Sequence, residues 1–188
     1  MAAFTREELD SFRDRSVDDL IGPAPRLLIV GINPGLWTAA TNTHFCHPTN
    51  RYYPALGLAG LIDWELDTAS GLSDHQRSDL VRRGIAITNL VARATARADE
   101  LDPSELTAGA ERLKGLVERI TPALVAVAGV TAYRVAFARP GAALGKQGET
   151  IAGSPLWVIP NPSGLNAHVS TADMAAWLRQ LAGEAALL

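Results

Sequence analysis

Four short, uninterrupted runs of apolar residues constrain the fold of this chain more than any other feature. Apolar runs of strand length that do not alternate with polar residues are typical of strands covered on both faces. Helical segments separate the runs, and this alternation predicts a parallel sheet with right-handed crossovers. We therefore expect an α/β protein with three α/β/α layers and a central, mainly parallel sheet. The expected strands are RLLIV (26–30), IAITNL (85–90), ALVAVA (123–128) and LWVIP (156–160).

Helix starts are marked by Ser, Thr or Asp with an acidic residue or Gln three positions later, the pattern of a capping box. No repeat or long linker interrupts the chain, so we expect one domain over residues 1–188, with residues 1–22 as an N-terminal helical extension. The expected helices begin after Thr5, after Ser73 (ending near Arg83), after Asp102 (ending near Ile120) and after Ser170.

Composition narrows the function classes. The chain has 188 residues, 47% of them hydrophobic, and a net charge of −3, which is ordinary for a globular protein and gives no general basic surface. Any nucleic-acid binding must then depend on a local basic patch. No apolar run approaches the roughly 18–20 residues of a membrane span, so we expect no membrane partner. The charged N-terminus does not resemble a signal peptide. The single cysteine, Cys46, excludes an internal disulfide and indicates a cytoplasmic protein.

The motif GINPG (31–35) follows the first expected strand and places Asn33 directly before Pro34. It lacks the glycine spacing of a dinucleotide-binding loop and the ending of a P-loop. Proline restricts the preceding residue to extended geometry, which orients the Asn33 amide. A plain turn after a strand is the alternative interpretation. Because ligands of open α/β sheets bind beyond the carboxyl ends of the strands, we expect Asn33, Asn89 and the 161–166 loop to gather around one crevice.

The segment THFCHPTNR (43–51) brings His44, Cys46 and His47 together in the sequence. A structural zinc site needs four ligands, and the two remaining histidines are isolated, so we expect no metal. Phe45 is an aromatic residue in a polar loop. It is expected either to stack on a planar base or to fill the core.

The segment NPSGLNAH (161–168) follows the last expected strand. Ser163 and the backbone of Gly164 suit contact with a phosphate. Leu165 is an apolar side chain in a polar, glycine-flanked loop, as expected of a wedge that fills the gap left by an extruded base. The alternative is that Leu165 packs against the C-terminal helix.

Taken together, GINPG, HPTNR, ITNLVAR and NPSGL, in this order and spacing, resemble the mismatch-specific uracil-DNA glycosylase and thymine-DNA glycosylase family of the uracil-DNA glycosylase superfamily. The resemblance extends from about Arg26 to Leu181. It implies an α/β/α fold and no metal or other cofactor. It also implies hydrolysis of the N-glycosidic bond of uracil or a related base opposite guanine, which leaves an abasic site.

The resemblance also implies roles for individual residues. Asn33 matches the asparagine that positions the attacking water. The base-binding residues are Ile32 through its backbone, Thr38 near the pyrimidine ring, Phe45 by stacking, and Asn89 on the neighbouring strand end. Gly164 and Leu165 match the loop that reads the widowed guanine and fills the base stack. The expected DNA-binding residues are Ser163, Gly164, Leu165, Asn166 and Lys146.

Two positions depart from the family pattern. Bacterial relatives typically read NPSGLSR, whereas this chain has Asn166 and Ala167 and so lacks an arginine beside the wedge. Trp37 replaces a small residue near the mouth of the expected pocket. These departures leave open how strictly guanine is recognised and which bases are accepted.

Glycosidic cleavage passes through an oxocarbenium-like sugar cation, and an amide orients water without being a strong base. Asp99, in the loop after the second expected strand, is therefore a second catalytic candidate that would polarise the water. A solvated loop acid beside Arg97 is the alternative. A lyase would need an amine nucleophile. The only lysines are Lys114, within an expected helix, and Lys146, in an expected loop, so we favour a monofunctional hydrolase.

The expected partner is double-stranded DNA that contains uracil or a mismatched or damaged pyrimidine, bound by a monomer. Arg51, Arg93 and Arg97, all in expected loops near the crevice, are the candidate basic patch. Two alternatives remain at this point. One is a nucleosidase-like hydrolase of small molecules on the same kind of sheet, and the other is a non-catalytic DNA-binding module.

Overall fold

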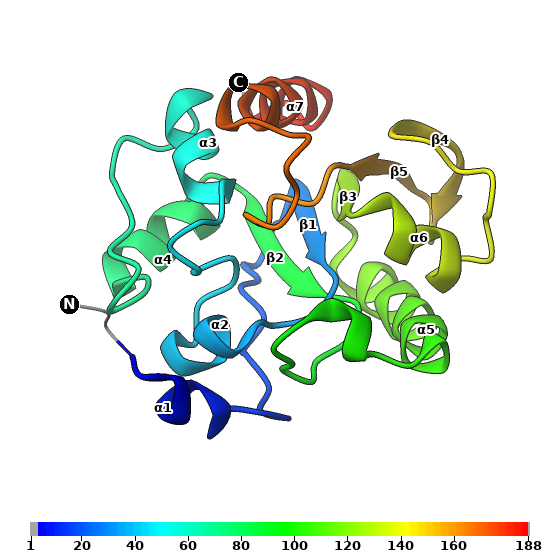
Figure 1. The fold of residues 1–188 in the computed structure, drawn as a ribbon. Coiled ribbons are helices and arrows are strands. Elements are labelled where there is room, and N and C mark those ends of the chain that lie inside the picture. The colour runs from blue at the N-terminus through cyan, green and yellow to red at the C-terminus, as the bar shows by residue number, and fades with distance from the viewer. Residues whose placement is uncertain (1–3, 188) are drawn as a thin grey trace.

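The computed structural model describes residues 4–187, and its centre is a five-stranded sheet with the order β2-β1-β3-β5-β4 (Figure 1). Strands β2, β1, β3 and β5 are parallel, and β4 runs antiparallel to β5 at one edge. The expected three-layer α/β/α fold is confirmed. The strands are β1 (Leu27–Gly31), β2 (Ile85–Asn89), β3 (Leu124–Ala128), β4 (Gly145–Ile151) and β5 (Ser154–Ile159).

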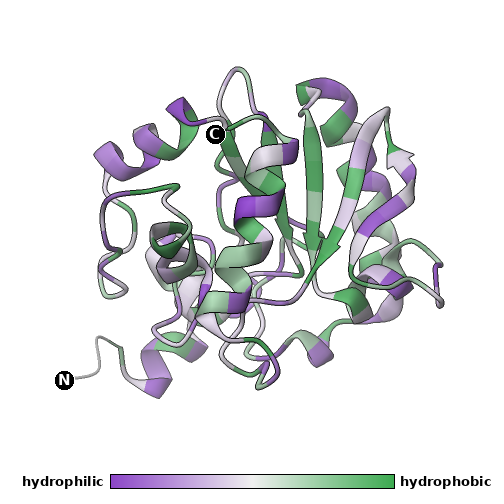
Figure 2. Ribbon diagram, turned by 90° about the horizontal axis from the view of Figure 1, so that it is seen from above, coloured by the Kyte–Doolittle hydropathy of each residue, from purple (hydrophilic) through white to green (hydrophobic). Residues whose placement is uncertain are grey.

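Each of the four apolar runs forms a parallel strand, as expected. Strands β1, β2 and β3 are buried at every position. Figure 2 shows the sheet as mostly hydrophobic, with hydrophilic residues on the helices around it. The register places Gly31 beside Asn89, so β1 and β2 end at the same edge.

Helices cover both faces of the sheet. The first face packs on α3 (Tyr52–Leu58), α4 (Asp74–Arg82) and α7 (Thr171–Glu184). The second packs on α5 (Pro103–Ile120) and α6 (Val130–Ala136). The short α2 (Leu36–Thr41) and the 3-10 turn η1 (Ala98–Glu100) border the carboxyl ends of β1 and β2. Capping boxes at Thr5, Ser73, Asp102 and Ser170 confirm the expected helix starts. Within residues 4–187, no helix is long and apolar enough to cross a membrane.

Two expectations about the fold are wrong. Lys146 lies in β4 rather than in a loop, because GKQGETI forms an edge strand in which half-buried and exposed positions alternate up to the buried Ile151. The N-terminal extension is helical only in α1 (Arg6–Asp10). Beyond that helix the chain is irregular, and Leu20 pairs with Ile87 through backbone N–O distances of 2.9 and 2.8 Å. Residues 1–3 lie outside the described part of the chain.

Candidate functional site

A pocket of about 600 Å³ opens where β1 and β2 end. Its walls come from the GINPG turn, the 45–50 loop, the end of β2, the 95–98 segment and the 161–166 loop. The structure thus brings Asn33, Asn89 and the 161–166 loop together. The Ile32, Thr38 and Phe45 side chains line the same pocket. No Asp or Glu of the described residues belongs to its lining.

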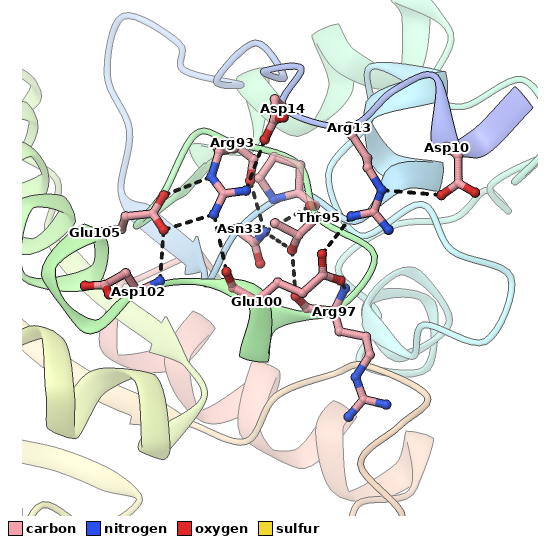
Figure 3. A network of polar contacts seen from close by, with 11 residues as sticks. Asp10, Arg13, Asp14, Asn33, Arg93, Thr95, Arg97, Glu100, Asp102 and Glu105 are labelled. Atoms are coloured by element: carbon pink, nitrogen blue, oxygen red, sulfur yellow. Dashed lines mark hydrogen bonds and ion pairs between the residues drawn. The ribbon is translucent and has the colours of Figure 1, made fainter. Parts of the chain in front are cut away.

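The orientation of the Asn33 amide is set by acceptors on the loop after β2 (Figure 3). Its Nδ2 donates to the Thr95 hydroxyl at 2.7 Å, to the Arg93 carbonyl at 3.0 Å and to the Pro34 carbonyl at 3.2 Å. Carbonyl oxygens only accept hydrogen bonds, so this side of the amide must be the NH₂ group. Thr95 Oγ1 in turn donates to the Arg97 carbonyl at 2.7 Å, which fixes the direction of its proton.

This arrangement leaves the Asn33 Oδ1 atom as the free end of the amide. Among the described residues it has no hydrogen-bond partner, while both hydrogens of the NH₂ group are directed at protein acceptors. Asn33 lines the pocket and is partly exposed. An acceptor held in this way can orient a water by accepting one of its protons. It does so without acting as a strong base.

Asn89 is oriented by His44 in a similar way. His44 is buried, which lowers its pKa and keeps the ring neutral. Its Nε2 lies 3.0 Å from the Asp18 carbonyl and must donate to it, so Nδ1 accepts from Asn89 Nδ2 at 3.1 Å. The Asn89 Oδ1 atom then lies over Gly31, where any Cβ would overlap with it. Asn89 lines the pocket as Asn33 does, and among the described residues its Oδ1 atom also has no hydrogen-bond partner.

Phe45 stands between the pocket and the core. Its backbone has φ of 57°, in the left-handed region that is uncommon for a bulky residue. One side of the ring packs on Tyr52, with ring centroids 4.6 Å apart, and the ring also lines the pocket. The contact with Tyr52 agrees with the interpretation of Phe45 as a residue that fills the core. Phe45 also borders the pocket, and stacking on a base stays a prediction.

The 161–168 loop presents Leu165 to solvent, with 82% of the residue exposed. This exposure excludes packing of Leu165 against the C-terminal helix. Ser163 and Asn166 line the pocket with it, while Gly164 lies against Thr49 so closely that a Cβ would overlap with that side chain.

Besides Gly164, two of the expected site residues do not line the pocket. Asp99 is exposed, and its Oδ2 lies 2.7 Å from Arg97 Nη2. The Arg97 guanidinium lowers the pKa of Asp99, so this carboxylate is a surface ion-pair partner. Lys146 is on β4, the strand at the far edge of the sheet from β2, and its Nζ lies 3.6 Å from Glu184 Oε2. The structure thus favours the alternative reading of Asp99 as a solvated acid.

The three candidate arginines of the basic patch are all engaged with protein groups. Arg51 donates to the Ser163 carbonyl at 2.8 Å, and Arg97 binds Asp99. Arg93 binds Glu105 through two hydrogen bonds of 2.9 and 3.0 Å and lowers the pKa of that carboxyl to about 2. Only Arg97 lines the pocket. All three arginines lie in loops, as expected, but the sequence gave no sign of their protein partners.

Sequence reasoning missed several residues of the site. Thr95 is 1% exposed and binds Asn33, yet it resembles any other small residue of its loop. The sequence presents His44 only as a possible metal ligand, whereas in the structure it orients Asn89. His47 lines the pocket, and its Nδ1 accepts from the Thr49 backbone at 3.2 Å. Across residues 4–187, no three His, Cys, Asp or Glu side chains are placed to hold a metal.

Comparison with known proteins bears on the fold and on the family of this chain. The solution NMR structure of a candidate uracil DNA glycosylase from Methanosarcina acetivorans has a similar fold, with a TM-score of 0.58 and 17% sequence identity. The match covers 89% of this chain and 98% of that one. At this level of identity, the likeness supports the fold alone. The family model "Uracil DNA glycosylase superfamily" matches residues 19–182, which include the whole pocket. The chain therefore belongs to the uracil DNA glycosylase superfamily.

Proposed function

We propose that this protein is a monofunctional DNA glycosylase that hydrolyses the N-glycosidic bond of uracil, or of a related pyrimidine opposite guanine, after extruding it from the duplex. The observation that carries the proposal is the Asn33 amide in the pocket lining, whose NH₂ group is held by Thr95 and the Arg93 carbonyl while its oxygen has no hydrogen-bond partner among the described residues. This arrangement suits the positioning of a water rather than its deprotonation.

The same pocket supports recognition of a base. Phe45 offers a ring for stacking. His44 holds the Asn89 Nδ2 atom, which leaves Asn89 Oδ1 able to accept a hydrogen bond. Uracil and thymine carry an N–H at N3 that can donate to this oxygen, whereas neutral cytosine has no proton there. The Asn89 amide therefore favours a uracil-type base.

Catalysis then depends on the leaving group. Negative charge grows on the departing base while the sugar becomes cationic, and the site needs to stabilise that separation and hold the water. No carboxylate of the described residues lines the pocket, so we expect slow turnover that favours bases which depart easily. Neither Lys114, which lies in α5, nor Lys146 lines the pocket, and this supports hydrolysis over a lyase reaction.

A panel of labelled oligonucleotides, each with one altered base, tests the proposal. The panel contains G·U, G·T, A·U, single-stranded uracil and a cytosine adduct opposite guanine. Base release is measured under single-turnover conditions by alkaline cleavage of the abasic product, with free uridine as a small-molecule control. Release from G·U duplex that is lost in Asn33→Ala supports the proposal. Cleavage of uridine alone would indicate a nucleosidase, and duplex binding without release would indicate a binding module.

A further inference from the structure

The family match begins at residue 19, and the chain before it forms backbone hydrogen bonds with the loop after β2. The Asp14 N–H donates to the Ala94 carbonyl at 3.0 Å, and the Ala94 N–H donates to the Arg15 carbonyl at 2.9 Å. Asp14 has φ of 61°, in the left-handed region, where the chain turns toward this loop. The two hydrogen bonds secure Ala94, whose neighbours on both sides in the sequence hold the Asn33 amide.

Two ion pairs, one from Arg13 and one from Asp14, reinforce these backbone hydrogen bonds (Figure 3). Asp14 Oδ1 lies 3.0 Å from Arg93 Nη1, and the same guanidinium binds Glu105 at the start of α5. Arg13 Nη1 lies 2.7 Å from Glu100 Oε2, while Glu100 Oε1 accepts a backbone N–H of the same loop at 2.8 Å. The N-terminal segment thus contacts the loop at two charged positions.

Apolar contacts anchor the segment beneath these ion pairs. Val17, Leu36, Ala39 and Ala94 form a small buried cluster, on which Leu9 and Phe12 pack. Leu36 belongs to α2, directly after the GINPG turn, and Ala94 belongs to the loop after β2. The N-terminal segment therefore bridges the two stretches of chain between which Asn33 lies.

We infer that residues 9–17 act as a clamp on the loop after β2 (residues 91–97). Arg13 and Asp14 are then positioning residues for Asn33. The inference rests on the proposed role of Asn33. The Asn33 amide keeps its orientation only while the Arg93 carbonyl and the Thr95 hydroxyl stay in place. Reaction rates are sensitive to small misplacements of a positioned group. Exposed ion pairs contribute little to overall stability, so the clamp acts on geometry more than on folding.

The test uses the full chain with the double substitution Arg13→Ala/Asp14→Asn, because asparagine tolerates the left-handed backbone at position 14 better than alanine does. Asp10→Asn is the matched control, because Asp10 is an exposed acid of the same segment whose one ion pair within residues 4–187 is with Arg13, at 3.5 Å. We expect the double variant to lose about tenfold in single-turnover release from G·U duplex, with duplex affinity and melting temperature nearly unchanged. The milder Asp14→Asn should lose about threefold, and Asp10→Asn should match the wild type.

Hydrogen exchange gives a second readout that does not need activity. Loss of the clamp should speed exchange of the amides in residues 91–97 and leave β1 and β3 unchanged, since local opening exposes these amides. Unchanged exchange there in the double variant would overturn the clamp. Faster exchange with an unchanged rate would overturn its role in catalysis. If the wild type releases no base while exchange still responds, the clamp stands and the proposed glycosylase function fails.

Discussion

Two of the loops that line the pocket differ in how firmly other residues hold them. The loop after β2 is held by several contacts. Thr95 is 1% exposed, and its hydroxyl accepts a hydrogen bond from Asn33 and donates one to the Arg97 carbonyl. Arg93 forms ion pairs with both Asp14 and Glu105. The 161–168 loop leaves Leu165 82% exposed and is held mainly by Arg51, which donates to the Ser163 and Pro162 carbonyls.

This difference indicates a division of labour. The groups proposed to position water are preorganised, because any reorientation during the reaction would cost part of the rate enhancement. Leu165, the proposed wedge, is exposed to solvent, from which it could enter a base stack. We therefore expect substitutions on one side of the pocket to change the chemical step, and substitutions on the other to change access to paired bases.

The largest expected effect comes from Asn33→Ala, which removes the water-positioning oxygen. Single-turnover base release should fall by roughly 10²–10⁴, with little change in duplex affinity. Rates on a G·U oligonucleotide at saturating enzyme measure this directly. An Asn33→Ala enzyme with full activity would sink the proposed mechanism and remove the contrast between the two loops.

Phe45→Ala should remove a stacking surface of about 1–3 kcal/mol, or roughly 5- to 150-fold in release at subsaturating enzyme. Its ring also packs on Tyr52, so the melting temperature must be followed in parallel. The informative control is Phe45→Tyr, which keeps the ring and should keep most of the activity. Unchanged release by a folded Phe45→Ala enzyme would show that the base does not stack there.

Leu165→Ala sharpens the comparison from the other side. Processing of paired uracil should fall about tenfold while single-stranded uracil is released almost normally, because only the duplex needs a plug after extrusion. Stability should hardly change, since the side chain is exposed. Equal losses on both substrates would assign Leu165 to the chemical step and contradict the division of labour.

Asp99→Ala has the smallest expected effect, within about twofold in single-turnover rate, because this exposed carboxylate pairs with Arg97 outside the pocket. The double variant Asn33→Ala/Asp99→Ala should then be no slower than Asn33→Ala. A severe loss in Asp99→Ala alone would revive the idea that an acid shares the water with Asn33.

Much of the fold was predictable because its signals are local. The parallel strands are continuous apolar segments, and the helices with side-chain caps are visible at Thr5, Ser73, Asp102 and Ser170. Helices α2, α3 and α6 were missed because no side chain caps their starts. Strand β4 was missed because its half-exposed, polar sequence becomes a strand only when paired with β5.

The sequence by itself determined the four parallel strands, the edge at which their polar ends meet, and the identity of Asn33, Asn89 and Leu165 as candidates. The carboxyl ends of parallel strands lie at the same edge of a sheet, and this rule applies without knowledge of any contact. Only the tertiary structure decided which way each amide points and which charges are free. Thr95 and Asn33 are 62 residues apart, and Arg93 and Asp14 are 79 apart, so no local pattern records these pairs. Hydrogen bonds act over about 3 Å, and which groups come within that range is set by the packing of the whole chain.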